Sequence, residues 1–241
     1  MCRHLAYLGA PRTLQALVVD PPHSLYEQSW APARQRHGTV NADGFGVGWY
    51  VGREAPVRYR RAQPIWSDAS FASLAPTIAT SCAVAAVRSA SAGMSADESA
   101  AAPFTHGRWL LSHNGRLRDW PTARKALLAD AADVPDTRVG VDSALLFGLA
   151  LSHWQAGAPL ADGLAGAARS VLDQGGGRLT MVASDGSSIA AVVVEEPLHL
   201  LTSADGVVVA SEPSDDGPWR EIADGTVVTV SVDGTTMTGL W

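Results

Sequence analysis

Two blocks of short apolar segments, one on each side of a helical stretch, constrain the fold of this chain most. Helices are predicted between the blocks, over residues 121–131, 141–154 and 160–173. Because strands and helices do not alternate one by one, the pattern favours an α+β fold with two mainly antiparallel sheets over a parallel doubly wound sheet. The predicted strands cover residues 2–8, 41–50, 57–61, 82–87, 108–113, 179–184, 188–194, 198–202, 206–211 and 226–231.

Two shorter helices are predicted outside the central stretch. One covers residues 13–19 and ends at Asp20-Pro21-Pro22, and the other is capped by Ser67-Asp68 and covers about 68–79. No segment rich in proline, serine or charge divides the chain, so we expect one domain over residues 2–241. Loops and turns are predicted at 9–11, 23–43, 90–107, 114–115, 185–186, 205–206 and 224–225.

Three glycines alternate along the predicted strand 41–50. Gly44, Gly46 and Gly48 leave one face of this strand without side chains, so we expect another part of the chain to approach it closely. The pattern is not a dinucleotide-binding fingerprint, because no helix follows it in a βαβ unit.

Composition excludes several classes of function. Apolar residues make up 46% of the chain, and the net charge of −6 argues against nucleic acid as the main partner. No apolar run reaches the roughly 18 residues of a membrane span, and no signal peptide is evident, so we expect a cytoplasmic protein with no membrane partner. The two cysteines give neither a disulfide framework nor metal-ligand spacing, and Cys82 lies in an apolar run that predicts a buried, inert thiol. The sequence does not predict the oligomeric state.

Cys2 is the strongest candidate for a catalytic nucleophile. Removal of Met1 places a thiol and a free α-amine on the same residue. An α-amine has an ordinary pKa near ~8, so it serves as a general base for its own thiol near neutral pH. The alternative is that Cys2 simply begins a strand.

Three other candidates lie at predicted ends of elements, and each has a structural alternative. Arg88 suits a carboxylate clamp, or it extends to solvent. Asn114 and Gly115 suit an oxyanion hole, with a side-chain amide and a backbone N–H as donors, or they form a hairpin turn. Asp142 suits a substrate ammonium, or it stabilises a helix N-terminus. Together with Cys2, this set suits cleavage of an amide carried by an amino acid.

These residues lie in segments that resemble the class II glutamine amidotransferases. The resemblance implies a four-layer αββα sandwich of the N-terminal-nucleophile hydrolase type, with no metal or cofactor. It extends over nearly the whole chain, and no synthetase, sugar-isomerase or phosphoribosyl domain is expected after it. The segments that carry it include Cys2-Arg3-His4-Leu5, Asn41-Ala42-Asp43-Gly44, Val87-Arg88-Ser89-Ala90, Ser112-His113-Asn114-Gly115, Val141-Asp142-Ser143 and Ala210-Ser211-Glu212-Pro213.

Within that family, the chain most resembles the stand-alone γ-glutamyl amidohydrolases of ergothioneine biosynthesis. These act on a small γ-glutamyl substrate, γ-glutamyl-hercynylcysteine sulfoxide, and release glutamate. Ordinary glutaminases usually have tryptophan and histidine where this chain has Ser89 and Ala102, and the smaller residues leave room for a leaving group larger than ammonia. The alternatives are a glutaminase subunit that supplies ammonia to a separate synthetase and a non-enzymatic binding domain, although the presence of all the candidate residues argues against the latter.

The resemblance also implies a leaving group with a trimethylammonium cation, which aromatic faces and carboxylates can hold. Trp30 lies in the polar segment 23–43, where no core requires it, and we expect it to line this part of the pocket with Asp43 as an anionic partner. Trp49 and Trp109 lie inside predicted strands and are expected to be core residues.

Overall fold

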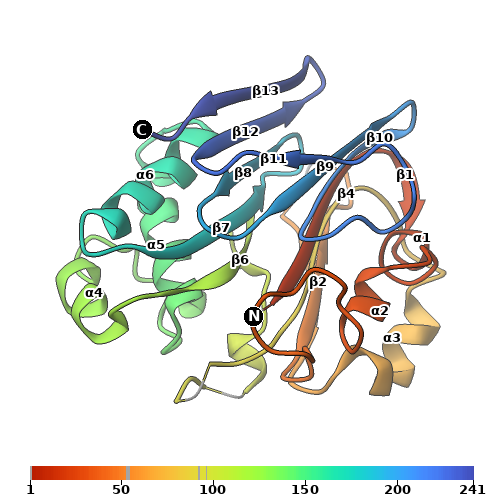
Figure 1. The fold of residues 1–241 in the computed structure, drawn as a ribbon, viewed down its shortest axis with the longest axis horizontal. Coiled ribbons are helices and arrows are strands. Elements are labelled where there is room, and N and C mark those ends of the chain that lie inside the picture. The colour runs from red at the N-terminus through yellow and green to blue at the C-terminus, as the bar shows by residue number, and fades with distance from the viewer. Residues whose placement is uncertain (1, 53–54, 92, 96) are drawn as a thin grey trace.

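A computed structural model of the chain describes residues 2–52, 55–91, 93–95 and 97–241 (Figure 1). Among these residues, no helix is long and apolar enough to cross a bilayer. In chain order the elements are β1 (Arg3–Thr13), α1 (Leu14–Val18), α2 (Leu25–Gln28), β2 (Phe45–Trp49), β3 (Val57–Arg61), α3 (Ala69–Leu74), β4 (Ala79–Val87), β5 (Phe104–His106), β6 (Trp109–Leu117), α4 (Trp120–Leu127), α5 (Asp142–Gln155), α6 (Leu160–Leu172), β7 (Gly177–Ser184), β8 (Ile189–Val193), β9 (Leu198–Ser203), β10 (Gly206–Ala210), β11 (Arg220–Ile222), β12 (Thr226–Ser231) and β13 (Gly234–Gly239).

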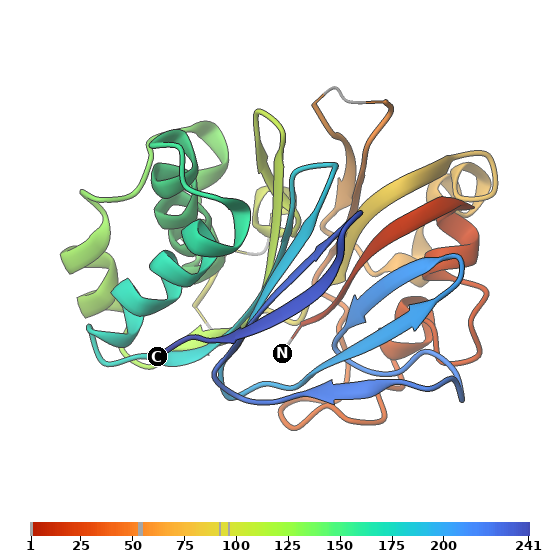
Figure 2. The same cartoon turned by 90° about the horizontal axis from the view of Figure 1, so that it is seen from above.

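The described strands form two antiparallel sheets that pack face to face. A seven-stranded sheet has the order β11-β9-β10-β1-β4-β2-β3, and a six-stranded sheet has the order β13-β12-β8-β7-β6-β5. Helices α1 to α3 cover the outer face of the first sheet, and α4 to α6 cover that of the second (Figure 2). The predicted α+β class with an αββα layer order is therefore confirmed.

Each interface between layers has its own apolar core. Val84, Leu110, Val182 and Ala191 belong to the core between the sheets. A second core lies under α4 to α6, and a third lies under α1 to α3. A fully buried aliphatic side chain contributes roughly 1.5–3 kcal/mol through transfer from water, so these cores fix the spacing of the layers.

Strand β1 of the seven-stranded sheet and strand β6 of the six-stranded sheet are joined by a polar contact inside the sandwich. His4 Nδ1 lies 3.1 Å from Ser112 Oγ, and both residues are fully buried. Side chains of a strand alternate between its faces, so Cys2 is on the same face as His4, and Asn114 is on the same face as Ser112. Ala6 and Leu110 both belong to the inter-sheet core on the other side of this contact. Cys2 and Asn114 are therefore at the same end of the space between the sheets.

Two predicted turns are wrong. The prediction that β1 ends at Gly9 fails, because the strand absorbs residues 9–11 in an irregularity between Leu8 and Arg12 and then pairs with β4 again. The Asn114-Gly115 turn is also absent, because β6 continues to Leu117 in unbroken register with β7.

The other differences concern short elements. The helix predicted over 68–79 ends at Leu74, because β4 already begins at Ala79. Segments 23–43 and 90–107 contain α2 and β5, and the sequence patterns also missed β11 and β13. These elements have three to six residues, too few for a hydrophobic period to show.

The close approach expected at the alternating glycines is confirmed. A Cβ atom on Gly46 would lie 2.4 Å from the carbonyl oxygen of Ala102, and one on Gly48 would lie 2.7 Å from the Leu110 side chain. Glycine at these positions lets β2 pack directly against the segment that leads into β5.

The buried His4 predicts a loss of stability in mild acid. Burial lowers the pKa of His4 from 6.5 to about 3, and Arg3 and His113 act in the same direction. The unfolded chain therefore binds a proton below pH 6.5 that the folded protein excludes, and stability falls by up to ~1.4 kcal/mol per pH unit as pH decreases. Urea unfolding should show that wild type loses about 2 kcal/mol more than His4→Gln between about pH 7.5 and about pH 5. As a control, the exposed His153 is changed to Gln, and this variant should lose the same unfolding free energy between the two pH values as wild type. If His4→Gln also lost as much as wild type, the account of His4 would be contradicted.

Candidate active site

Cys2 lies just before the first residue of β1 and is half-buried. Pairing of β1 with β4 begins at Arg3, so the sheet does not hold Cys2 directly. Its Sγ lies 4.0 Å from the carbonyl oxygen of Ser89, and its own carbonyl accepts a hydrogen bond of 2.9 Å from Arg3 Nε. The expected removal of Met1 concerns a residue outside the described ones and stays a prediction.

Arg88 follows β4 and lies one residue from Ser89. Its guanidinium donates to the backbone carbonyls of Asp43 at 3.3 Å and Ser95 at 2.6 Å, and the residue is 7% exposed. Because the side chain is buried and bound by two backbone carbonyls, the reading of Arg88 as a side chain extended to solvent is wrong. Two backbone carbonyls hold the guanidinium without an ion pair among the described residues. A hydrogen bond from the Ser95 side chain lowers the pKa of the exposed Asp97 carboxyl, and the charge of Arg88 contributes to that shift.

Asp43 is bound to the residues that follow β4. Its backbone N–H donates to the carbonyl of Arg88 at 2.9 Å, and its carboxylate accepts from the N–H of Ala90 at 2.7 Å. The structure therefore brings Cys2, Ser89, Arg88 and Asp43 together.

Asn114 and Gly115 lie in the part of β6 that pairs with β7. Asn114 is fully buried, yet neither Oδ1 nor Nδ2 has a hydrogen-bond partner among the described residues. Gly115 has φ +152°, and a Cβ atom there would lie 1.9 Å from the carbonyl oxygen of Arg178. Buried polar groups are almost always paired, so an unpaired amide beside an obligatory glycine indicates a ligand site rather than a structural contact.

Asp142 opens α5 and binds the end of the same strand. Its carboxylate accepts from the N–H of Leu117 at 3.3 Å and from the N–H of Ser143 at 2.9 Å. These contacts fit the role at a helix N-terminus and also fix the carboxylate near the end of β6. Among the described residues, no hydrogen bond or ion pair joins Asp142 to Cys2, Arg88 or Asn114.

Trp30 follows α2 and is 38% exposed. Its ring makes edge contacts with Tyr26 and Trp66, at centroid distances of 4.9 and 5.8 Å. Trp49 is buried, and Trp109 stacks on Trp154 in the core under α5, so the structural expectation for these two is confirmed.

The sequence patterns missed three buried charged residues near Cys2. Arg3 pairs with Glu212 at 3.2 Å, and Glu196 Oε1 lies 2.9 Å from Arg178 Nε. Burial lowers the pKa of Arg3, while Glu212 and Glu196 oppose that shift. A charged residue in a segment that carries the family resemblance, such as Glu212, was the available signal.

A groove of about 470 Å³ extends from this region. Arg178, whose carbonyl lies against Gly115, is one of the residues that line the groove. Glu196 is another, and its Oε2 has no hydrogen-bond partner among the described residues. The groove carries both signs of charge. Its other charged or titratable residues are Arg36, His37, Glu195, Glu221 and Asp224.

Cys82 differs from Cys2 in every respect that matters for reactivity. It is buried between the sheets, its Sγ lies 3.0 Å from Ser184 Oγ, and burial raises the pKa of its thiol to about 11. The predicted inert thiol is thus consistent with its surroundings.

Comparison with known proteins gives consistent matches. The family described as glutamine amidotransferases class-II matches residues 13–204. A protein of Mycolicibacterium smegmatis named gamma-glutamyl-hercynylcysteine sulfoxide hydrolase is 43% identical over 238 residues, which is 95% of this chain and 96% of that protein. A protein of the same name from Mycobacterium tuberculosis is 41% identical over 245 residues, covering 100% and 97%.

Solved structures of proteins with similar descriptions share the fold of this chain. A glutamine aminotransferase class-II domain protein from Silicibacter pomeroyi is 26% identical, with a TM-score of 0.73 and full coverage of both chains. Glutamine phosphoribosylpyrophosphate amidotransferase of Bacillus subtilis is 16% identical and shares the fold, with a TM-score of 0.74 over 100% of this chain and 49% of that one.

The unpaired amide of Asn114 predicts an unusual response to truncation. Asn114→Ala removes no hydrogen bond within the described residues, so the free energy of unfolding should change by less than about 1 kcal/mol. The control is Asn41→Ala, because Asn41 Nδ2 donates to Gln28 at 2.9 Å and to Gln35 at 3.0 Å. That variant should lose about 1–2 kcal/mol in the same urea experiment. A loss in Asn114→Ala as large as in Asn41→Ala would mean that the Asn114 amide supports the fold.

Proposed function

This chain belongs to the class II glutamine amidotransferases, and we propose that it hydrolyses the γ-glutamyl amide bond of γ-glutamyl-hercynylcysteine sulfoxide. The two relatives with this name support the substrate, because their identity extends over at least 95% of the chain. The proposed chemistry is supported by the contacts that bring Cys2, Ser89, Arg88 and Asp43 together beside the end of β4. The Asn114 amide, which has no hydrogen-bond partner among the described residues, lies at the same end of the space between the sheets.

In the proposed reaction, the Cys2 thiol transfers its proton to the α-amine of the same residue, and the thiolate attacks the γ-carbonyl carbon. The Asn114 amide and the Gly115 N–H stabilise the oxyanion. When the C–N bond breaks, the ammonium proton moves to the departing nitrogen and a γ-glutamyl thioester remains. Water then hydrolyses the thioester and releases glutamate.

Arg88 is proposed to bind the α-carboxylate of the glutamyl group, and Asp142 its α-ammonium. The support for Arg88 is its buried positive charge without a carboxylate partner among the described residues. A bidentate guanidinium–carboxylate contact satisfies such a charge and aligns the γ-carbonyl with Cys2. Asp142 is the weaker assignment, because its contacts are explained by the helix and by β6.

The leaving group is proposed to pass Ser89, whose small side chain leaves space beside Cys2, and to extend towards the groove next to Arg178. The mixed charges of that groove suit a zwitterionic amino acid. Trp30 is proposed to face the trimethylammonium group, while Asp43 acts less directly, because its carboxylate already binds Ala90.

We further infer that residues 2–241 act as one domain in the cytoplasm, where both thiols remain reduced. The pairing of β1 with β10 and β4 supports the single domain, since one sheet contains strands from both halves of the chain.

The function is tested by product analysis with purified protein. Wild type should release glutamate from γ-glutamyl-hercynylcysteine sulfoxide with a higher kcat/KM than from glutamine. Cys2→Ala should reduce turnover to trace level and keep the thermal unfolding midpoint, because the half-buried thiol contributes little packing. The neutral control is Cys82→Ser, which places a hydroxyl beside Ser184. Preference for glutamine would favour a glutaminase subunit, and clear turnover by Cys2→Ala would exclude the thioester route.

The Trp30 assignment predicts a selective loss. Trp30→Ala should raise KM for the hercynyl substrate by about tenfold, the order expected for one cation–aromatic contact, and leave glutamine hydrolysis unchanged. Trp66→Ala is the matched control, because Trp66 is equally exposed at 38% and packs against the same cluster. Equal losses on both substrates would assign Trp30 to the packing of α2.

A further inference from the structure

The position of the nucleophile depends on very few contacts. Sheet pairing begins only at Arg3, and the polar contact given for the Cys2 thiol is a long one, 4.0 Å to the Ser89 carbonyl. The hydrogen bond of 2.9 Å from Arg3 Nε to the Cys2 carbonyl is the shorter of the two hydrogen bonds that Cys2 makes with described residues. This bond holds the peptide plane between Cys2 and Arg3, and therefore the Cα atom that carries both the amine and the thiol side chain.

Arg3 is itself held from the far end of the chain. It is fully buried, and its Nη1 donates to Glu212 Oε1 at 3.2 Å. Its remaining nitrogen, Nη2, has no partner among the described residues although it is buried. The guanidinium therefore spans the distance between the Cys2 carbonyl and the Glu212 carboxylate.

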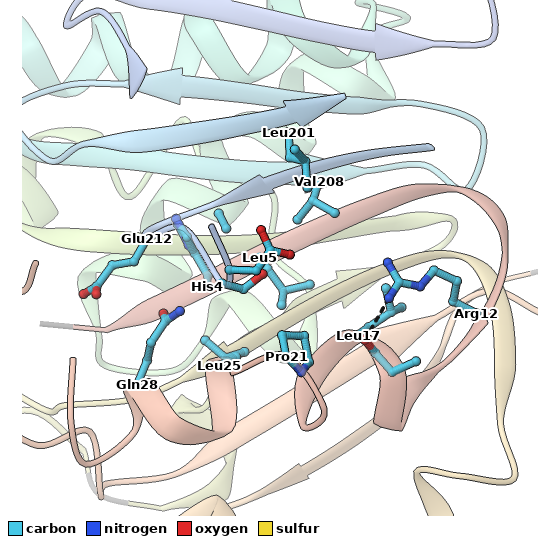
Figure 3. A pocket seen from close by; sticks show the side chains of 14 residues that line it. His4, Leu5, Arg12, Leu17, Pro21, Leu25, Gln28, Leu201, Val208 and Glu212 are labelled. Carbon is cyan, nitrogen blue, oxygen red and sulfur yellow. Dashed lines mark hydrogen bonds between the residues drawn. The ribbon is translucent and has the colours of Figure 1, made fainter. Parts of the chain in front are cut away.

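Glu212 is a fixed anchor rather than a mobile counter-ion. It is fully buried, and its Oε2 accepts from the N–H groups of Ala33 and Arg34 at 2.8 and 2.9 Å and lies 2.9 Å from His23 Nε2. Figure 3 shows Glu212 beside the start of β1 and near Gln28 of α2. Both residues line a small cavity of about 50 Å³. The start of β1 and residues 23–34, both far from Glu212 in sequence, thus converge on its carboxylate.

Stability alone is a poor explanation for this pair. Taking a guanidinium and a carboxylate out of water costs several kcal/mol per ion, and apolar residues of similar volume often give an equal or greater stability. The unpaired Nη2 adds a further cost. An arrangement that is expensive for folding and adjacent to the nucleophile indicates a functional constraint.

We propose that Arg3 is a positioning residue that holds the Cys2 carbonyl, and thereby the thiol and amine, in the orientation for attack, with Glu212 as its anchor. The inference rests on the proposed function of Cys2 and adds the residue on which its geometry depends. A misplacement of about 1 Å in a reacting group can reduce the rate by about 100-fold, so a single hydrogen bond at this place has a large effect.

The direct test is Arg3→Lys. Lysine keeps the positive charge opposite Glu212 but has no N–H at the ε position that faces the Cys2 carbonyl. We expect kcat to fall by about 10- to 100-fold with KM within about threefold of wild type, because the substrate clamp is unchanged. The loss should be equal for the hercynyl substrate and for glutamine, since Arg3 acts on the nucleophile and not on the leaving group.

A second measurement needs no substrate. 2-Cyanobenzothiazole condenses with the thiol and amine of an N-terminal cysteine, and mass spectrometry reports the labelled fraction with time. If Arg3 restrains Cys2, Arg3→Lys should be labelled several-fold faster than wild type at an unchanged thermal unfolding midpoint. Slower turnover together with faster labelling distinguishes lost positioning from a general loss of structure.

Two further variants keep the result decisive. Arg3→Met combined with Glu212→Gln removes both buried charges, so it should fold even where Arg3→Lys does not, and it should show the same loss of kcat. Arg58→Lys is the matched control, because Arg58 forms another largely buried ion pair, with Asp136, that does not contact Cys2. It should lower stability and leave kcat unchanged.

The outcomes separate this inference from the proposed function. If wild type cleaves the hercynyl substrate and folded Arg3→Lys keeps its kcat and labelling rate, the positioning role is wrong and the function stands. If wild type cleaves neither substrate, the proposed function fails, and the labelling rates alone decide whether Arg3 restrains Cys2. A kcat loss of the same size in Arg58→Lys would assign the Arg3 effect to stability.

Discussion

The face-to-face packing of the two sheets is the constraint on which the rest of the structure depends. The two halves of the candidate site belong to different sheets. Cys2 and Arg88 adjoin β1 and β4 of the seven-stranded sheet, while Asn114 and Gly115 lie in β6 of the six-stranded sheet and Asp142 begins α5. The inter-sheet core sets the distance between these halves, together with polar contacts between the sheets such as His4–Ser112 and Cys82–Ser184. A change in that core would therefore act on the site without touching any of its residues.

The strand pattern was predictable from the sequence because it is local: alternation and turn residues predicted most of the strands. The proposal that Cys2 is the nucleophile is also local, because it depends only on a thiol and an amine in one residue. The wrong turns at Gly9 and at Asn114-Gly115 have a common cause. In each case, pairing with a neighbouring strand continues past residues whose local preference is to turn, and that pairing is invisible in a short window of sequence.

Contacts between distant segments could not be predicted from the sequence for the same reason. Arg3 and Glu212 are 209 positions apart, and neither has a neighbour in sequence that predicts a buried ion pair. The family resemblance pointed to both segments without giving the contact. The roles proposed for Arg88 and Asn114 came from residue type. The structure adds that the Arg88 guanidinium is buried and bound by backbone carbonyls, and that the Asn114 amide has no hydrogen-bond partner among the described residues.

The pairing of β1 has a consequence for the order in which the protein assembles. Leu5 pairs with Ala210 on one side and with Ala85 on the other, so the strand behind the nucleophile cannot be completed until the ribosome has made most of the chain. Contacts of such high sequence separation slow folding, because the chain between them must first lose its conformational freedom. The first residues synthesised are thus among the last to reach their final place, and the Cys2 thiol takes up its folded geometry only after the chain as far as Ala210 has been made.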